Sequence, residues 1–423
     1  MSSTSTRDVY LVIGGSGFLG RHIVNALLAR GDIVSVFDIV QRYDDVPFFS
    51  GDISDEAQVG DALKKSGTTC IIHTASPAHG LEDPALYWKV NVDGTKAVIA
   101  AAQACGVRKL VYTSSAGVVF NGADIIDVDE RAPFPEKAMD AYNESKAKAE
   151  EMVLAANGKQ GLLTIALRPA GIFGPGDRQV MAGFVEVYKK NQTHFQIGDN
   201  NNLFDWTYVE NVAHAHLLAA DKLNEPPLTP EQKNQLISNP LPQITATTGK
   251  HKIPTSESRP LGPAVVPPPN AAQIQANWEN PEYTGSAERP LRRNRFDQFS
   301  ETSLSHQQQQ QQQSEEEKET DSSSSAIWAR LDQHYGEGFR TKKSRITLPK
   351  EVGMIFAGAA EWWGWLSGKE PTFTRFRVKF TCASRWHNIE KSRRLLGYEP
   401  VFGIEEGINK MVDWYVSQNP IKN

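Results

Sequence analysis

The sequence predicts an α/β fold in which a doubly wound parallel sheet is followed by a smaller C-terminal substrate lobe. Three observations lead to this prediction: β-branched runs alternate with helical patterns, a glycine cluster follows the first run, and the composition changes abruptly after residue 223. Such alternation places parallel strands side by side, with helices covering both faces of the sheet. A Rossmann-type sheet interrupted by a long disordered insertion is therefore expected.

Five short apolar runs are predicted to be buried parallel strands. They are Val9–Ile13, Ile33–Asp38, Cys70–Thr74, Leu110–Ser114 and Leu162–Leu167. The segments between them have helical patterns, namely Arg21–Arg30, Ser54–Lys65, Ala85–Cys105 and Tyr142–Ala156. Residues 8–223 are thus predicted to form a dinucleotide-binding domain together with part of the substrate lobe.

Residues 224–325 have a low-complexity composition. Thirteen of the 24 prolines lie between Pro226 and Pro290, and seven consecutive glutamines, an acidic run and four serines follow. Few apolar residues are available to form a core, so this segment is predicted to be disordered. It is either a disordered insertion or translated non-coding or alternatively spliced material. Residues 326–423 are predicted to complete the substrate lobe, with helical or apolar segments at 326–331, 347–366 and 404–416.

Charge and cysteine content exclude several classes of protein. The net charge of −5 includes an acidic run within the low-complexity segment, so no basic field for nucleic acid is expected. Three scattered cysteines give neither a disulfide framework nor a zinc motif, and a reducing compartment is expected. Four histidines without metal-ligand companions are interpreted as structural: His73, His79, His214 and His216. A small molecule is the expected partner, and no metal is predicted.

A glycine-rich segment lies directly between the first strand and the first helix. It consists of Gly14, Gly15, Ser16, Gly17, Phe18, Leu19 and Gly20. Glycines at these spacings give a tight turn, allow the backbone to approach a pyrophosphate and let the helix pack closely. An ordinary strand-to-helix turn is the alternative. We interpret the segment as the phosphate-binding turn of a dinucleotide site.

Further cofactor contacts are expected at the carboxyl ends of the strands, where ligands of such sheets bind. Asp38 closes the second strand, where a carboxylate accepts hydrogen bonds from the adenosine ribose and repels a 2′-phosphate. This favours NAD, although the nearby Arg42 leaves NADP open, and a capping or turn role is the alternative for Asp38. Residues expected to line the adenine and the nicotinamide-side ribose are Asp52, Ile53, Thr74, Ala75 and Ser76.

Tyr142 and Lys146 are candidates for acid–base chemistry. They are four residues apart at the start of a helical pattern, so both project from one helix face. A neighbouring ammonium and a positively charged nicotinamide favour the phenolate, which predicts that Tyr142 is a general base. Ser115 follows the fourth strand and supplies a hydroxyl for the substrate oxygen, with Ser114 as the competing choice. On its own, a Tyr-x-x-x-Lys pair is usually a solvated surface pair. The acid–base interpretation depends on the position of this pair downstream of the glycine turn.

Taken together, these motifs resemble the extended short-chain dehydrogenase/reductase family, specifically its 3β-hydroxysteroid dehydrogenase branch and the fungal decarboxylating members of that branch. The resemblance covers roughly residues 8–223 and 326–418. It rests on the glycine turn, Asp38, Asp52-Ile53, His73-Thr74-Ala75, Asn91-Val92-Asp93-Gly94-Thr95, Tyr112-Thr113-Ser114-Ser115, Tyr142-x-x-x-Lys146, Leu167–Asp177, Phe204–Val212, Glu361–Leu366, Glu370–Phe380 and Leu396–Pro400.

The resemblance implies an activity and a site. The catalytic residues would be Ser115, Tyr142 and Lys146, with Ser115 and Tyr142 at the substrate. The backbone of Pro169, Ala170, Gly171 and Ile172 would lie beside the nicotinamide. The implied reaction is NAD(P)-dependent oxidation of the 3β-hydroxyl of a 4α-carboxysterol to the 3-ketone with decarboxylation at C4, in ergosterol biosynthesis. The alternatives are oxidation of another hydroxysteroid or small alcohol, and a dinucleotide-sensing module without catalysis.

The C-terminal lobe contains candidate membrane and carboxylate contacts. Trp362, Trp363 and Trp365 predict either a helix at a bilayer interface or an ordinary buried helix. Alternation in the segment 373–380 predicts a strand with three cations on one face, for anionic lipid, the substrate carboxylate or solvent. Arg178 is a second candidate for that carboxylate. By resemblance, peripheral contact with the cytosolic face of the endoplasmic reticulum membrane is expected, in a homodimer or a sterol-demethylation complex.

Overall fold

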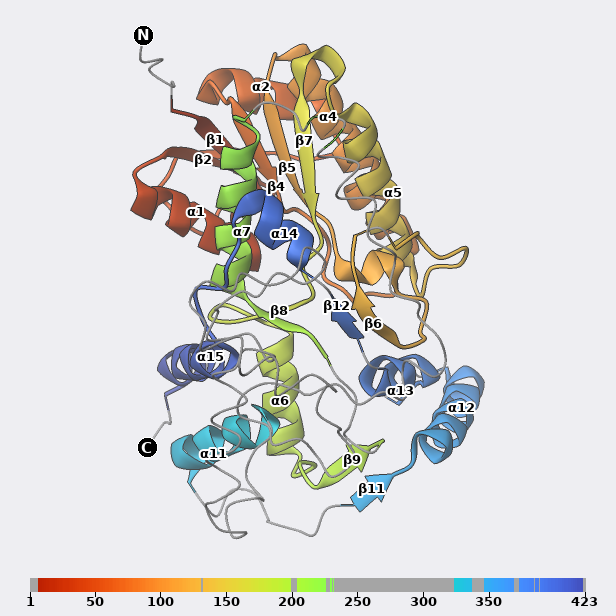
Figure 1. The fold of residues 1–423 in the computed structure, drawn as a ribbon. Helices are drawn as coiled ribbons and strands as arrows, with labels where there is room; N and C mark the ends of the chain where they lie inside the picture. The colour runs from red at the N-terminus through yellow and green to blue at the C-terminus, as the bar shows by residue number, and fades with distance from the viewer. Residues whose placement is uncertain are drawn as a thin grey trace.

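The computed structural model describes residues 7–130, 132–198, 204–225, 229, 231, 323–336, 346–368, 373–383, 385–387 and 389–420. Figure 1 shows a sheet with helices on both of its faces above a smaller lobe of helices and short strands. Most of the segment 224–325 lies outside the described residues, so its predicted disorder stays a prediction. Residues 224–225, 229, 231 and 323–325 of this segment are described, and Ser323–Ser325 form the first turn of helix α11 (Ser323–Tyr335).

Six parallel strands form the main sheet in the order β3-β2-β1-β4-β5-β7. Their bounds are β1 Val9–Ile13, β2 Ile33–Asp38, β3 Phe48–Ser50, β4 Cys70–His73, β5 Lys109–Thr113 and β7 Leu163–Leu167. The strand order reverses at β1 and β4, and ligands of such sheets bind beyond the carboxyl ends of the strands at this point. The predicted α/β fold with a Rossmann-type sheet is confirmed.

Helices cover both faces of the sheet because side chains alternate along each buried strand. Tyr10 and Val12 of β1 pack in one apolar cluster with α1 (Phe18–Arg30) and α7 (Val209–Lys222). Leu11 and Ile13 point the other way. That face is covered by α2 (Glu56–Ser66), α4 (Thr95–Ala104) and α5 (Ala141–Ala156). The sheet therefore has a core on each side, and only its strand ends are available to a ligand.

The helix predicted over 85–105 is divided in the structure. It consists of α3 (Pro84–Tyr87), a π-helical segment η1 (Trp88–Gly94) and α4. The side chain of Asp83 caps the start by accepting a hydrogen bond from the backbone N–H of Leu86. Within η1 the buried Asn91 donates a hydrogen bond of 2.9 Å to Ser145 Oγ on α5. This bond ties the wider turn to the helix that carries Tyr142.

The smaller lobe is built from short parallel strand pairs and helices. The pairs are β8 (Gly171–Phe173) with β10 (Trp206–Tyr208), β9 (Phe195–Ile197) with β11 (Ile346–Leu348), and β6 (Ile125–Val128) with β12 (Arg385–His387). The helices are α6 (Val180–Lys189), α11, α12 (Lys350–Ser367), α13 (Arg375–Cys382), α14 (Glu390–Leu396) and α15 (Ile404–Gln418), and two 3-10 turns are η2 (Ala116–Val119) and η3 (Lys159–Gly161). In Figure 1 the β6–β12 pair lies near the lower end of α5.

The strand predicted within 373–380 is wrong, because residues 375–382 form helix α13. The side chain of Thr374 caps the helix by accepting a hydrogen bond of 3.2 Å from the backbone N–H of Arg377. Phe376 and Phe380, four residues apart, stack with ring centroids 5.8 Å apart, and Val378 is buried. The three cations of this segment therefore do not share one strand face.

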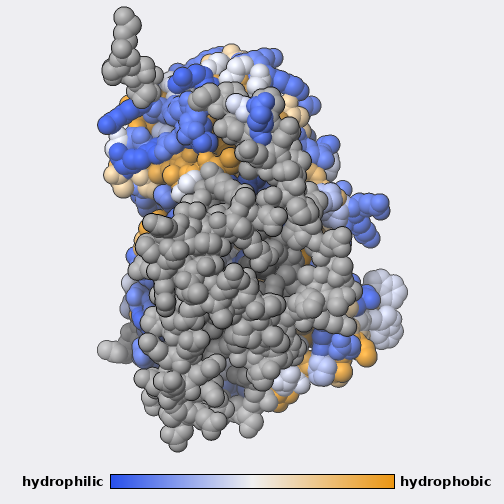
Figure 2. Space-filling model, in the orientation of Figure 1, coloured by the Kyte–Doolittle hydropathy of each residue, from blue (hydrophilic) through white to orange (hydrophobic). Residues whose placement is uncertain are grey.

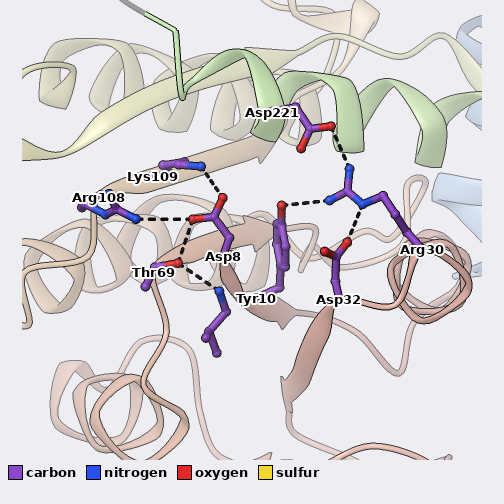
Figure 3. A network of polar contacts seen from close by, with 9 residues as sticks. Asp8, Tyr10, Arg30, Asp32, Thr69, Arg108, Lys109 and Asp221 are labelled. Carbon is purple, nitrogen blue, oxygen red and sulfur yellow. Dashed lines mark hydrogen bonds and ion pairs between the residues drawn. The ribbon is translucent and has the colours of Figure 1, made fainter. Parts of the chain in front are cut away.

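A polar network fixes the amino-terminal ends of the strands (Figure 3). Asp8 forms a buried ion pair with Lys109 and accepts a hydrogen bond of 2.8 Å from Thr69 Oγ1. Arg30 binds Asp32 and Asp221 at 2.5 and 2.8 Å and donates to the hydroxyl of Tyr10. The network joins β1 and β5 to helices α1 and α7.

Helix α12 lies at the surface of the smaller lobe. Its buried residues are small, Gly353, Ala357 and Gly364, whereas Ile355, Phe356, Trp362, Trp363, Trp365 and Leu366 are all more than half exposed. Figure 2 shows pale and hydrophobic surface at the lower right, where Figure 1 places α12. The helix is therefore not an ordinary buried helix, and its contact with a bilayer interface stays a prediction. Among the described helices, none has the length and apolar character that crossing a bilayer requires.

Candidate active site

Tyr142 lies in the first turn of α5, at the edge where the main strands end. The carboxylate of Asp140 caps this helix by accepting a hydrogen bond of 2.7 Å from the backbone N–H of Asn143. The phenol of Tyr142 hydrogen-bonds with the side chains of Ser115 and Ser76. The structure therefore brings together a phenol and two hydroxyls that come from the ends of β5 and β4 and from α5.

The pKa of Tyr142 differs in direction from the prediction. Burial raises it to about 12, and the hydrogen bonds with Ser115 and Ser76 oppose this rise. The sequence predicts that Lys146 and a positively charged nicotinamide both favour the phenolate. Desolvation of the ring, which has the largest effect on the phenol, acts in the opposite direction.

Lys146 is buried beneath Tyr142 on the same helix and is 2% exposed. Its Nζ donates a hydrogen bond of 2.5 Å to the carbonyl of Thr113 and lies 4.3 Å from the centre of the Tyr112 ring. Burial lowers the pKa of Lys146 to about 7, while the nearby Glu150 raises it. The hydrogen bond to Thr113 thus fixes the amino group of Lys146 at the end of β5, and burial brings its pKa close to neutral pH.

The two adjacent serines after β5 face different groups. Ser114 Oγ is buried and donates a hydrogen bond of 2.5 Å to Glu150, which is itself 2% exposed. Ser115 Oγ accepts a hydrogen bond of 3.0 Å from the backbone N–H of Gly117 and contacts the phenol of Tyr142. Of the two serines, Ser115 is the one that contacts the phenol of Tyr142, and its role in holding the substrate oxygen stays a prediction.

The glycine turn fits a dinucleotide phosphate. A Cβ on Gly14 would lie 2.7 Å from the backbone nitrogen of Ala75, and one on Gly20 would lie 2.1 Å from the carbonyl oxygen of Gly14. Gly17 precedes α1 without a side-chain cap, and no acidic residue lies in the first turn. Backbone N–H groups at such a helix start attract an anion. The turn is therefore shaped and charged for a phosphate.

Asp38 and Arg42 both contact the glycine turn. Asp38 Oδ2 accepts a hydrogen bond of 3.0 Å from the backbone N–H of Ser16, and Arg42 donates one of 2.9 Å to the Ser16 carbonyl. A carboxylate beside the turn favours free ribose hydroxyls, whereas the guanidinium favours a 2′-phosphate. Both groups predicted to influence the choice between NAD and NADP thus lie where the adenosine ribose is expected.

Two of the other predicted cofactor residues, Asp52 and Ile53, follow β3, the strand that pairs with β2 and so lies next to Asp38. Asp52 forms an ion pair of 2.8 Å with Lys89, whose hydrogen bond lowers the Asp52 pKa to about 2. Ile53 is buried against Gly94, which has no room for a Cβ. The pairing of Asp52 with Lys89 orients its carboxylate, whereas Ile53 packs in the core beside the sheet, so its contact with an adenine stays a prediction.

The remaining predicted cofactor residues follow β4 and β7, at the carboxyl ends of these strands. Thr74 Oγ1 donates to the carbonyl of Ile13, which fixes the 74–76 segment beside the turn. The carbonyl of Pro169 accepts a hydrogen bond of 2.9 Å from the backbone N–H of Ala116, directly after Ser115. Residues 169–172, including Ala170 and the β8 residues Gly171 and Ile172, thus continue from β7 past the site.

His79, which the sequence predicts to be a structural residue, lies beside Tyr142 at the site. Its ring lies edge-on to Tyr142 with centroids 5.0 Å apart, its Nε2 is 3.2 Å from Asp140 Oδ2, and Phe380 stacks on it. Its position soon after β4 was the available signal, because loops at that edge surround the ligand. Arg178, the predicted carboxylate contact, is exposed.

The fold is that of nucleotide-sugar epimerases. The structure of UDP-glucose 4-epimerase from Thermus thermophilus in complex with NAD matches 97% of this chain and 99% of that chain, with a TM-score of 0.54 and 20% identity. At this level of identity, the similarity concerns the fold alone.

Sequence comparison defines the family. The model of the 3-beta hydroxysteroid dehydrogenase/isomerase family matches residues 11–245. The decarboxylating sterol-4-alpha-carboxylate 3-dehydrogenase of Saccharomyces cerevisiae is 39% identical over 422 residues, covering 96% of this chain and 97% of that protein. The enzyme of the same name from Mus musculus is 46% identical over 217 residues, covering 51% of this chain and 59% of that protein. The chain belongs to the 3-beta hydroxysteroid dehydrogenase/isomerase family.

Proposed function

We propose that the protein oxidises the 3β-hydroxyl of a 4α-carboxysterol to the 3-ketone, with loss of the C4 carboxylate, in sterol biosynthesis. NAD is the proposed cofactor, and NADP is the second candidate. The observation that carries the proposal is the hydrogen-bonded group of Tyr142, Ser115 and Ser76 beside the glycine turn. The names of the fungal and mammalian relatives supply the substrate class.

The side chains of the site supply proton transfer and orientation. A bound oxidised nicotinamide supplies the hydride acceptor and a positive charge. Ser115 holds the C3 oxygen while Tyr142, as its phenolate, takes the hydroxyl proton. The cationic form of Lys146, one helical turn away, favours that phenolate.

Decarboxylation follows from the oxidation. The new ketone lies β to the carboxylate, so the C4–carboxylate bond breaks with its electron pair delocalised as an enolate. Carbon dioxide leaves, and the enolate takes a proton to give the 3-ketone. The protein has only to hold the oxygen at C3 during this step, which Ser115 and Tyr142 are placed to do.

The test uses the purified full-length chain with NAD and two 3β-hydroxysterols that differ only in the 4α-carboxylate. We expect NADH and carbon dioxide to form together from the carboxysterol, and NADH to form much more slowly from the other sterol. Equal rates would contradict the substrate assignment and favour another hydroxysteroid. Binding of NAD without turnover of either sterol would favour the sensing module.

We also propose that the α12 surface contacts the cytosolic face of the endoplasmic reticulum membrane. Tryptophan side chains favour the bilayer interface, and Trp362, Trp363 and Trp365 are 61%, 64% and 78% exposed. The adjoining helix α13 carries Arg375 and Lys379 at the surface, and such cations are attracted to anionic lipid. These features support a peripheral position from which a sterol enters directly from the bilayer.

Vesicle sedimentation tests the membrane proposal. Replacing Trp362 and Trp365 by serine should lower binding to vesicles of phosphatidylcholine with anionic lipid, while turnover of detergent-solubilised sterol is unchanged. The matched control replaces Trp88, an exposed tryptophan on the main domain, and should bind as the wild type does. Unchanged binding of the α12 variant would contradict the proposal. Imaging of the tagged full-length protein in cells checks the organelle.

A further inference from the structure

Arg385 is a buried cation among aromatic rings. The residue is 9% exposed, and its guanidinium carbon lies 3.7 Å from the centre of the Phe380 ring, 4.1 Å from that of Phe204 and 4.8 Å from that of Phe120. Burial lowers its pKa to about 10, so it stays charged at neutral pH. The rings stabilise the cation through their faces and leave its in-plane N–H groups to find acceptors.

The described part of the chain supplies too few acceptors for this guanidinium. Nη2 donates to the backbone carbonyl of Phe380 at 3.3 Å, whereas the buried Nε has no hydrogen-bond partner. No carboxylate among the described residues forms an ion pair with Arg385. The nearby Asp205 raises the Arg385 pKa, but its Oδ2 is already bound to the backbone N–H of His387 at 2.8 Å and lies 3.0 Å from the His387 ring.

An unpaired buried cation is unfavourable unless an anion joins it. A planar guanidinium that keeps unused donors matches a carboxylate, which accepts two parallel hydrogen bonds. The aromatic surroundings exclude water and strengthen such a bond. Arg385 therefore has the properties of an anion-binding group in an otherwise apolar environment.

Two series of contacts connect the guanidinium to the proposed reaction site. The ring of Phe380 stacks on His79 with centroids 5.8 Å apart, and His79 lies 5.0 Å from the ring of Tyr142. Phe120 ends the 3-10 turn η2, which Ser115 caps. Two rings thus separate Arg385 from the phenol, and one short turn connects its aromatic surroundings to Ser115.

We infer that Arg385 binds the carboxylate of the substrate and so selects sterols that carry one. This inference rests on the proposed function and names the residue that recognises the group to be lost. The ion pair forms with the bound sterol before oxidation and stabilises the carboxylate, so it contributes to substrate binding and does not accelerate loss of carbon dioxide. Arg385 is accordingly a specificity-determining residue, with its effect mainly in KM.

The experiment compares the wild type with Arg385→Gln in the full-length chain, using a 4α-carboxysterol and the matched sterol without the carboxylate. We expect kcat/KM for the carboxysterol to fall on the order of 10- to 100-fold, mainly through KM. For the sterol without the carboxylate, kcat/KM should change less than about twofold, because no charged hydrogen bond is lost. For the carboxysterol, the kcat/KM of Arg385→Lys should lie between those of the wild type and Arg385→Gln. Lysine keeps the positive charge but cannot donate two parallel hydrogen bonds to a carboxylate. The control Arg7→Gln, at an exposed arginine on the main domain, should behave as the wild type on both sterols.

Each outcome separates the inference from the proposed function. If the wild type does not prefer the carboxysterol, the substrate assignment fails, and the inference falls with it. If the wild type prefers it and Arg385→Gln keeps the same preference, Arg385 is not the recognition group. Equal losses on both sterols would assign Arg385 to the packing of β12 and overturn the inference. If Arg385→Gln does not fold, the Arg385→Lys comparison decides in the same way, with NAD-dependent thermal stabilisation as the check on folding.

Discussion

Arg168 forms a bidentate ion pair with Glu150 beneath helix α5. Arg168 Nη2 lies 2.6 Å from Glu150 Oε1, and Arg168 Nε contacts both carboxylate oxygens at 3.0 Å. Ser114 donates to the same carboxylate. The pair connects the helix that carries Tyr142 to the segment after β7, where the nicotinamide is expected, so it holds the two halves of the site at a constant separation.

Replacing Glu150 by glutamine should destabilise the protein and weaken turnover. Glutamine removes the negative charge that pairs with Arg168, whose side chain is 16% exposed, and the loss of this largely buried ion pair costs about 3 kcal/mol of unfolding free energy. The control is Glu151→Gln, because the neighbouring Glu151 forms an exposed pair with Lys148 whose loss costs less than about 1 kcal/mol. Urea unfolding of both variants measures the difference. Equal stability of the two variants would show that the buried pair does not support the site.

The stability of the folded protein should depend on pH through Lys146. Its folded pKa is about 7, lower than the ordinary value of 10.5, because of burial. Between these values the unfolded chain holds a proton that the folded chain has lost, so unfolding free energy contributed by this group rises with pH across that window. Lys146→Met should remove a rise on the order of a few kcal/mol.

The control for that experiment is Lys148→Met, at an exposed lysine on the same helix. Thermal or urea unfolding is followed from pH 6.5 to pH 10 for both variants and the wild type. If the wild type and Lys146→Met have parallel stability curves over this range, Lys146 has an ordinary pKa in the folded protein. Parallel curves for Lys148→Met and the wild type are expected.

The network at the amino-terminal strand ends should affect stability without affecting catalysis. Asp8→Asn leaves Lys109 buried without its partner, and we expect a loss of about 3 kcal/mol. Turnover per folded molecule should be unchanged, because the network lies at the amino-terminal ends of the strands (Figure 3), whereas Tyr142 contacts Ser115 beyond the carboxyl end of β5. Asp61→Asn is the control, since Asp61 pairs with Lys65 at an exposed surface. A selective loss of kcat in Asp8→Asn would contradict this separation.

Asp38 and Arg42 should shift cofactor preference in opposite directions. Asp38→Asn keeps a side-chain oxygen for the Ser16 N–H but removes the negative charge, so the ratio of kcat/KM for NAD to that for NADP should fall on the order of tenfold. Arg42→Gln removes the positive charge, and the same ratio should rise. A change in the same direction for both variants would show that these charges do not determine the choice.

Much of the main domain was predictable because its signals are local. The β-branched runs and the glycine turn specify strand, turn and helix within a few residues, and α1 begins immediately after the turn. The strand predicted within 373–380 was wrong because the same alternation is compatible with a helix. Thr374 caps that helix, and Phe376 packs on Phe380 one turn later. Period alone does not separate these structures in so short a segment.

The environment of the site was not predictable, because distant segments create it. His79 meets Phe380, some 300 residues later, and the aromatic surroundings of Arg385 come from three separate parts of the chain. The pKa of Tyr142 likewise depends on burial by packing that the Tyr-x-x-x-Lys spacing does not contain. Residue types and their order predicted the chemical groups, whereas the tertiary fold determined which groups meet.

Single-turnover NADH formation by Tyr142→Phe most directly tests the assignment of Tyr142 as the proton acceptor. The variant keeps the ring that contacts His79 and Tyr87 and loses only the hydroxyl. We expect the rate of hydride transfer from the 4α-carboxysterol to fall by about 10²- to 10⁴-fold, while the affinity for NAD and the melting temperature stay close to those of the wild type. A rate within twofold of the wild type would contradict the account.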